Sequence, residues 1–266
     1  MATSASDEKV AKAEKVPRYK RILLVRHGES VENIRVRAAR STWARMKSFK
    51  LPLASEVWNM CKLIGLDEDS DLSPTGNDMV ERMCADLKLS HNSGPFHPNP
   101  PELAVYSPLK RAKKTFEIGL LPLLPKISVE CSNLLVERRV SEHVYAQQRF
   151  RNRVSAFERW IDAREEKSII IVGHSQFFKH LLGSACPLSK FSNCDIWEYT
   201  RLGKGEDRFW KSKKQWYSSP LSEKYPPKSS EFVVKPVTSR STYDGREITT
   251  GDAAGQSPED LKHSRL

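Results

Sequence analysis

The sequence predicts an α/β protein, a three-layer α/β/α sandwich around a mostly parallel central sheet. Two observations predict it. Short apolar runs, such as residues 22–25 and 169–172, have the length and composition of strands that are buried on both faces. Amphipathic segments of helical period separate these runs, so strands and helices alternate along the chain. No apolar run approaches the length that a bilayer requires, and we therefore expect no membrane association.

The individual elements follow from local signals. Ser73 and Pro74 suit an N-cap and a first helical position, and the apolar residues after them repeat every four residues. Ser107 and Pro108 repeat this start and predict a helix to about residue 118. The expected strands are 22–25, 103–106, 127–129, 168–172 and 196–199. The expected helices are 30–47, one from 73, 107–118, 147–164 and one that carries 177–182.

One catalytic domain is expected over residues 18–220. Residues 1–17 are polar and predict a flexible N-terminal segment. From about residue 220 onward, prolines, serines and charged residues dominate. This composition indicates that residues 221–266 form a mostly disordered or loosely docked tail, with at most one short strand at 232–234.

The composition narrows the functional classes. The formal net charge of +11 is typical of a basic solvated surface or of a site that attracts anions, and no nucleic-acid recognition motif accompanies it. The N-terminal residues contain no apolar stretch, so no secretory signal is expected. The five cysteines form no CxxC pair, which indicates reduced thiols rather than a structural zinc site. We expect a cytoplasmic protein with no nucleic-acid partner.

Residues suited to bind phosphate follow three of the predicted strands. Arg26 and His27 follow the first, Arg111 comes shortly after the second, and His174 follows the strand that ends at residue 172. A single histidine after a strand is more often structural than catalytic. In an open parallel sheet, however, ligands bind beyond the carboxyl ends of the strands. If these strands are parallel neighbours, the four side chains converge on one spot.

These residue types suit phosphoryl transfer. A neutral imidazole such as that of His27 is a good nucleophile towards phosphorus. Arg26 and Arg111 can form forked hydrogen bonds to the phosphoryl oxygens, and His174 can donate another. A carboxyl group is still required to protonate the leaving oxygen. No metal or other cofactor is expected, because these groups can neutralise the phosphate and no acidic cluster suggests magnesium.

At these residues the chain resembles the histidine phosphatase superfamily, also called the phosphoglycerate mutase-like family. LLVRHGESVEN at 23–33 resembles its RHG signature, VYSPLKRAKKT at 105–115 its arginine motif, and IIIVGHSQFFKHLL at 169–182 its second histidine motif. Three further segments, DLSPTGNDMV, VERRVSEH and SNCDIWEY, are similar to other family motifs. The set follows the family's order over about residues 21–200.

The resemblance implies a role for each matching residue. His27 would be the nucleophile that becomes phosphorylated, and Glu137 the proton donor, with Glu142 as a nearby alternative. The phosphate-binding residues would be Arg26, Asn33, Arg111 and His174. The implied activity is metal-independent hydrolysis of phosphomonoesters through a phosphohistidine. The implied substrate is a small phosphorylated metabolite or a phosphoprotein, and the family analogy also allows a homodimer.

Two departures from the pattern favour a phosphatase over a mutase. Phosphoglycerate mutases typically read Glu-Arg-His-Tyr-Gly where residues 137–141 read ERRVS, and they carry tryptophan where this chain has Glu32. The alternatives are a mutase-type transfer within a small metabolite and a catalytically weak binding module on the same fold. The basic residues Arg138 and Arg139 and the basic run at 35–50 hint at a second negative group on the substrate.

Two segments extend beyond what a minimal family member needs. Residues 36–70 form a basic insert, either a lid over the pocket or a peripheral helical hairpin. The last three residues, Ser264, Arg265 and Leu266, resemble the peroxisomal address Ser-Lys-Leu. Import into a peroxisome-type organelle is therefore an expectation beside a cytoplasmic location.

Overall fold

The computed structural model describes residues 19–47, 69–90, 92–138, 142, 146–186, 191–203 and 208–221, and of residues 40–46 it describes the backbone alone. The predicted N-terminal segment 1–17 lies outside these residues. So do residues 48–68 of the predicted insert and the tail from residue 222, including the strand expected at 232–234.

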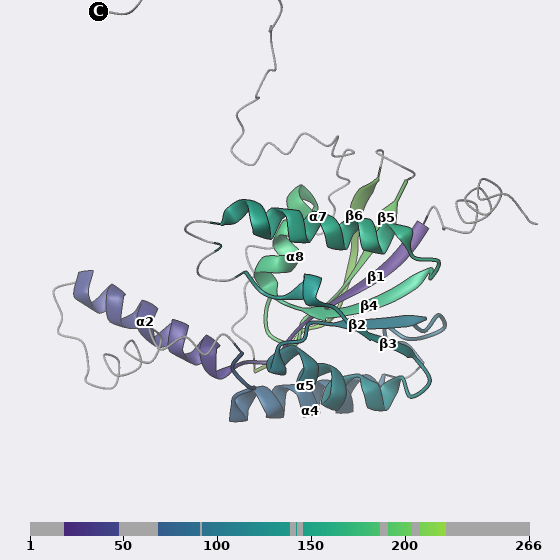
Figure 1. The fold of residues 1–266 in the computed structure, drawn as a ribbon. Coiled ribbons are helices and arrows are strands. Elements are labelled where there is room, and N and C mark those ends of the chain that lie inside the picture. Colours follow the sequence, from purple (N-terminus) through teal and green to yellow (C-terminus); the bar gives the residue numbers. More distant parts are fainter. Residues whose placement is uncertain are drawn as a thin grey trace, which may run out of the picture.

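The described residues form one six-stranded sheet in the order β3-β2-β4-β1-β5-β6 (Figure 1). Its strands are β1 (Tyr19–Arg26), β2 (Leu103–Tyr106), β3 (Ser128–Cys131), β4 (Ser168–Gly173), β5 (Ile196–Leu202) and β6 (Phe209–Tyr217). The first four in this order are parallel neighbours, whereas β5 and β6 pair antiparallel. The predicted mostly parallel sheet is confirmed.

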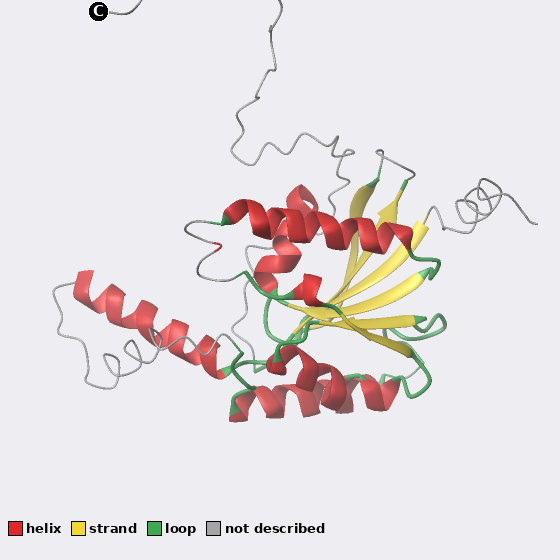
Figure 2. Cartoon of the chain, viewed as in Figure 1, coloured by secondary structure: helices red, strands yellow, loops and turns green. Residues whose placement is uncertain are grey.

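Helices cover both faces of the sheet (Figure 2). On one face lie α7 (Gln147–Ala163) and α8 (Ser175–Leu182), and on the other lie α4 (Pro74–Leu89) and α5 (Lys110–Gly119). Side chains alternate between the faces along each strand, so Ile22 and Leu24 join the core under α7 while Leu23 joins the core under α4. The three-layer α/β/α prediction is therefore confirmed.

The start of α4 agrees with the local signals. Ser73 is the N-cap, its hydroxyl accepts a hydrogen bond from the Gly76 N–H at 2.9 Å, and Pro74 occupies the first helical position. The helix buries the predicted four-residue repeat, Met79, Met83 and Leu87, against the sheet. No helix in the described part of the chain is long and apolar enough to span a membrane.

The helix start predicted at Ser107 is wrong. Helix α5 begins at Lys110, its N-cap position is Leu109, and no side chain caps it. Ser107 instead continues the line of β2, since its N–H donates to the Val172 carbonyl at 3.0 Å. Ser107 therefore does not share a helix face with Arg111, and its hydroxyl is available to the site.

Most strands extend beyond their predicted bounds, and one was not predicted. The segment expected at 127–129 begins one residue later and ends two residues later, as Ser128–Cys131. Strand β6 was not expected at all, because its sequence FWKSKKQWY mixes lysines with aromatic residues. It lies at the edge of the sheet, where one side of the strand is solvated and such a pattern is tolerated.

The first helix after β1, α2 (Val31–Lys47), projects away from the sheet (Figure 1). It includes residues 36–47 of the predicted insert, so this part of the insert lengthens a helix. Three short 3-10 turns complete the described elements, η1 (Leu121–Leu123), η2 (Asn133–Leu135) and η3 (Gly183–Ala185).

Candidate active site

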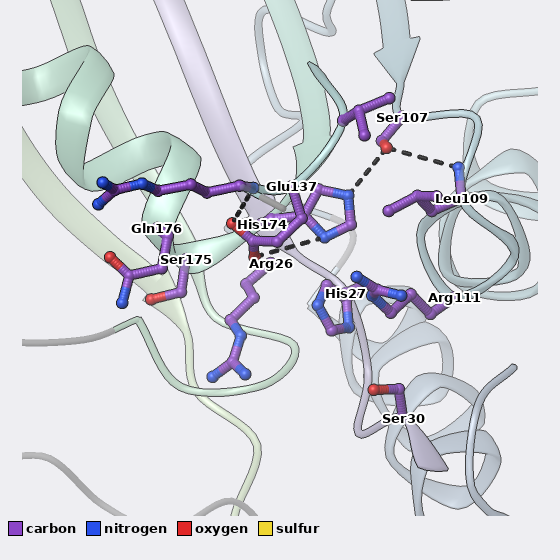
Figure 3. Close-up of polar contacts among 12 residues, drawn as sticks. Arg26, His27, Ser30, Ser107, Leu109, Arg111, Glu137, His174, Ser175 and Gln176 are labelled. Carbon is purple, nitrogen blue, oxygen red and sulfur yellow. Dashed lines mark hydrogen bonds and ion pairs between the residues drawn. The ribbon is translucent and has the colours of Figure 1, made fainter. Parts of the chain in front are cut away.

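The pairing of β1 with β4 brings the two predicted histidines together. Arg26 is the register partner of Gly173, so the residues that follow, His27 and His174, leave the sheet side by side. The His27 N–H donates to the Gly173 carbonyl at 3.1 Å. The two imidazole rings have centroids 5.0 Å apart and are tilted by 59°. The site thus lies at the carboxyl ends of the parallel strands, as expected (Figure 3).

The local backbone sets the tautomer of His27. Its Nδ1 lies 2.6 Å from the carbonyl oxygen of Gly28. A carbonyl only accepts, so Nδ1 carries the hydrogen and Nε2 keeps its lone pair. The Gly28 N–H in turn donates to the Thr115 hydroxyl at 3.0 Å, which ties this turn to α5.

Gly28 also allows the turn to lie close to α4. A Cβ atom at this position would stand 2.8 Å from Val80 Cγ2 and 2.9 Å from the Gly76 carbonyl oxygen. Real Cβ atoms do not come so near, so any side chain at position 28 would push His27 away from its neighbours.

Two buried guanidinium groups flank the imidazoles. Arg111 lies in the first turn of α5 with 3 % of its surface exposed, and Arg26 ends β1 with 4 % exposed. Figure 3 shows Arg111 beside His27. The Arg26 guanidinium donates a hydrogen bond to the Phe191 carbonyl.

Burial and these positive charges keep both imidazoles neutral. Desolvation lowers the pKa of His27 well below its usual value of 6.5, and the charges of Arg111 and Arg26 lower it further. The pKa of His174 is likewise lowered well below 6.5, chiefly by desolvation and then by Arg111. A neutral imidazole with a free Nε2 is the form that can act as a nucleophile.

His174 is oriented by Ser107, which was not predicted as a site residue. Ser107 Oγ lies 2.8 Å from His174 Nε2 and accepts a weak hydrogen bond from the Leu109 N–H at 3.5 Å (Figure 3). A hydroxyl can accept and donate at the same time, so the Ser107 hydroxyl can also donate its hydrogen to Nε2. His174 Nδ1, buried and without a hydrogen-bond partner within the described residues, then carries the proton on the side of Glu137.

Glu137 is the carboxyl group beside the histidines. It follows η2, whose buried Leu135 anchors the segment in the core under α7. Its Oε2 lies 3.7 Å from His174 Nδ1. Desolvation raises the pKa of Glu137 to about 7, against the opposing charge of Arg111. Near neutral pH a substantial fraction of this carboxyl group is therefore protonated.

The alternative carboxyl, Glu142, has a different environment. Both of its oxygens accept hydrogen bonds from the Arg153 guanidinium, the longer at 2.9 Å. Only 6 % of Glu142 is exposed. A carboxylate whose two oxygens are both engaged by one guanidinium group is a poor candidate for a proton donor to substrate. The geometry therefore favours Glu137 as the acid, a role that stays a prediction.

Asn33 supports the nucleophile turn in the described geometry. Its Oδ1 accepts from the Ser30 N–H at 3.2 Å and from Asn193 Nδ2 at 3.2 Å, and its own N–H donates to the Ser30 hydroxyl at 3.2 Å. Asn193 Nδ2 also donates to the His27 carbonyl at 3.0 Å. Asn193 was missed as a site residue, although it lies in the SNCDIWEY motif. Contact of Asn33 with a phosphate stays a prediction.

The same groups could hold a metal ion. One ligand atom from each of His27, Glu137 and His174 lies within 4.8 Å of the others. The charges of Arg26 and Arg111, which lower the pKa of both histidines, work against a cation at this point and favour an anion.

No family model and no curated protein matches the sequence. The chain is similar to the structure of a phosphoglycerate mutase from Bacillus anthracis str. Sterne, at 14% identity and a TM-score of 0.49 over 75% of this chain and 94% of the other. It is also similar to a mycobacterial glucosyl-3-phosphoglycerate phosphatase, at 15% identity and a TM-score of 0.45 over 76% of this chain and 100% of the other.

The likeness is one of fold. Substrate and residue roles do not transfer at such identities.

Proposed function

We propose that the protein belongs to the histidine phosphatase superfamily and hydrolyses phosphomonoesters through a phosphohistidine on His27. One observation carries the proposal. A neutral imidazole with a free Nε2 lies among two guanidinium groups, a second neutral imidazole and a carboxyl group whose pKa is about 7.

The first half of the reaction would transfer the phosphoryl group to the protein. His27 Nε2 attacks phosphorus, and the bond from phosphorus to the ester oxygen breaks. Arg26 and Arg111 stabilise the negative charge on the three transferring oxygens, and His174 Nδ1–H donates to one of them. The protonated Glu137 gives its proton to the leaving alkoxide, so the product leaves as a neutral alcohol.

The second half would return the site to its starting state. Glu137, now ionised, accepts a proton from a water molecule as that water attacks the phosphohistidine. The bond between phosphorus and His27 Nε2 breaks, inorganic phosphate is released, and Glu137 is protonated again. No step needs a metal ion, because the guanidinium groups supply the positive charge.

The test is a phosphatase screen over a panel of phosphorylated metabolites and phosphopeptides, run with chelator present. We expect free phosphate release that survives the chelator and falls at least about a thousandfold in His27→Ala, because the nucleophile is lost. His97→Ala is the matched control, since His97 is an exposed imidazole outside the site. Activity that persists in His27→Ala, or that the chelator abolishes, would refute this mechanism.

A mutase is the second candidate, and the sequence departures at Glu32 and at 137–141 argue against it. A mutase keeps the phosphoryl group and returns it to another hydroxyl, so it needs a phosphorylated primer. We expect steady phosphate release without any bisphosphate. Isomerisation of a monophosphate with no free phosphate would favour the mutase instead.

A further inference from the structure

A carboxylate of the protein itself lies on one of the phosphate-binding guanidinium groups. Glu32 Oε2 is 3.2 Å from Arg111 Nη1. The Arg111 side chain is 3% exposed, whereas that of Glu32 is 41% exposed, so the pair joins the buried site to the surface. Glu32 thus pairs with the positive charge of Arg111 that a substrate phosphate would otherwise bind.

The backbone holds Glu32 in this position. Glu32 lies in the first turn of α2, directly after the turn that carries His27. Its N–H donates to the hydroxyl of Ser70 at 3.3 Å, and Ser70 is 3% exposed. Among the described residues, the ion pair with Arg111 is what restrains the carboxylate. Because Glu32 is partly solvated, water weakens this pair, so the side chain can turn away when a stronger anion arrives.

The charge of Glu32 reaches the reacting groups. It is among the causes that raise the pKa of Glu137, and Arg111, its partner, lowers the pKa of both His27 and His174. A phosphoryl group bound between His27 and Arg111 would therefore lie close to the Glu32 carboxylate.

On the basis of the proposed function, we infer that Glu32 is a specificity-determining residue that competes with the substrate phosphate for Arg111. Once displaced, its negative charge remains at the edge of the site. It disfavours a second anionic group next to the phosphate and favours a substrate that presents a neutral, hydroxyl or ammonium group there.

A neighbouring basic residue does not offset this selection. The sequence hinted that Arg138 could receive a second negative group. In the structure Arg138 donates to the Glu142 carbonyl at 3.3 Å, and its guanidinium stacks over the Phe150 ring at 5.5 Å. Its charge is thus already engaged towards α7. Arg139 lies outside the described residues.

The first experiment measures anion binding without turnover. The dissociation constant of orthovanadate and of inorganic phosphate is determined by calorimetry for the wild-type protein, Glu32→Gln and Glu117→Gln. We expect Glu32→Gln to bind both anions about tenfold more tightly, because a like charge is removed beside them. Glu117→Gln removes the same charge from α5, where Glu117 pairs with Lys113, and should match the wild type within about twofold.

The second experiment measures discrimination. The ratio of kcat/KM for phenyl phosphate to that for 2-carboxyphenyl phosphate should be about tenfold smaller in Glu32→Gln than in the wild type. The alkaline limb of the pH profile should also move to lower pH in Glu32→Gln, since Glu32 helps to raise the pKa of Glu137. A residue that only stabilised the fold would move neither quantity.

The outcomes separate the two proposals. Unchanged or weaker anion binding in Glu32→Gln, or no anion binding by any of the proteins, overturns the role of Glu32. If Glu32→Gln binds anions more tightly but no variant turns over a phosphomonoester, the competition for Arg111 holds and the proposed phosphatase activity fails.

Discussion

At the residue scale, burial and neighbouring charges shift the pKa values of the site residues away from their values in water. His27 is 2 % exposed and lies beside two guanidinium groups, so its imidazole stays neutral below the pH at which a solvated histidine takes up a proton. Glu137 is shifted the opposite way, because burial raises the pKa of a carboxyl group. The nucleophile and the acid therefore coexist in their active forms near neutral pH.

The pH profile should report these two shifts. The acid form of Glu137 is lost as the pH rises through about 7, so kcat/KM should fall on the alkaline side of that value. The acidic limb should lie below pH 6.5, since the pKa of His27 is lowered.

In Glu137→Gln we expect kcat to fall by about a hundredfold to a thousandfold and the alkaline limb to disappear. Glu165→Gln, an exposed change in the loop after α7, is the control. A limb that survives in Glu137→Gln would assign the proton to another group.

Ser107 should act through His174. Removing its hydroxyl leaves His174 Nε2 without its partner at 2.8 Å, and the tautomer that presents Nδ1–H to the phosphate loses its support. We expect Ser107→Ala to lower kcat/KM about tenfold and the free energy of unfolding by about 1–3 kcal/mol, because a buried ring nitrogen is left unsatisfied. Nitrogen NMR of the His174 ring should show a changed tautomer. Ser90→Ala, at the exposed end of α4, should leave both unchanged; an unaltered His174 signal in Ser107→Ala would disprove the coupling.

At the element scale, α4 sets the position of the nucleophile turn. Its N-cap residue, Ser73, makes two hydrogen bonds to Glu29. The Ser73 hydroxyl donates to the Glu29 carboxylate at 3.0 Å, and the Ser73 N–H donates to the Glu29 carbonyl at 2.9 Å. Gly76 makes room for this contact, since a Cβ there would lie 1.9 Å from the Glu29 carbonyl oxygen. The backbone of the turn thus rests on the backbone of the helix.

A side chain at position 76 should therefore disturb both stability and activity. We expect Gly76→Ala to lower the free energy of unfolding by about 2–4 kcal/mol, although alanine favours helices, because backbone atoms must separate. Activity should fall as well, since His27 moves with the turn. Chemical denaturation and kinetics measure the two effects. Asp78→Ala, an exposed change in the same helix, should cost less than about 0.5 kcal/mol. A Gly76→Ala protein as stable as the wild type would contradict the close packing.

At the scale of the whole molecule, two cores hold the sheet and meet its helices on either face. Both cores, with the partly buried side chains packed against them, draw their residues from positions 22–217 of the described part of the chain. The predicted catalytic domain over 18–220 stays a prediction that truncation can test.

Removal of residues 222–266 should leave the enzyme intact. We expect kcat/KM for phenyl phosphate to stay within about twofold and Tm to change by no more than about 2 °C, because the composition of this segment predicts a mostly disordered or loosely docked tail. Truncation before β6, at residue 208, is the contrasting variant and should unfold, since β6 pairs with β5 and buries Trp210. Loss of activity on removing 222–266 alone would show that the tail docks near the site.

Much of this architecture follows from short-range patterns. Residues that are close in sequence predict the apolar strands, the helix start at Ser73 and Pro74, and the amphipathic face of α7. The structure agrees with these predictions. The motif residues after β1, β2 and β4 likewise suffice to predict the four converging side chains, because parallel strands end at the same edge. These features depend on interactions between residues that are close in sequence, so the order of residues is enough to predict them.

Long-range pairing decided the rest. The register of Arg26 with Gly173 places the centroids of the two imidazole rings 5.0 Å apart. The segment after η2 brings Glu137 close to His174, whereas Glu142 pairs with Arg153. The roles of Ser107, Asn193 and Glu32 depend on such pairing too, since each contacts a partner that is dozens of residues or more away in the sequence. Burial and the neighbouring charges that shift each pKa exist only once distant segments pack together, so no local pattern could have contained them.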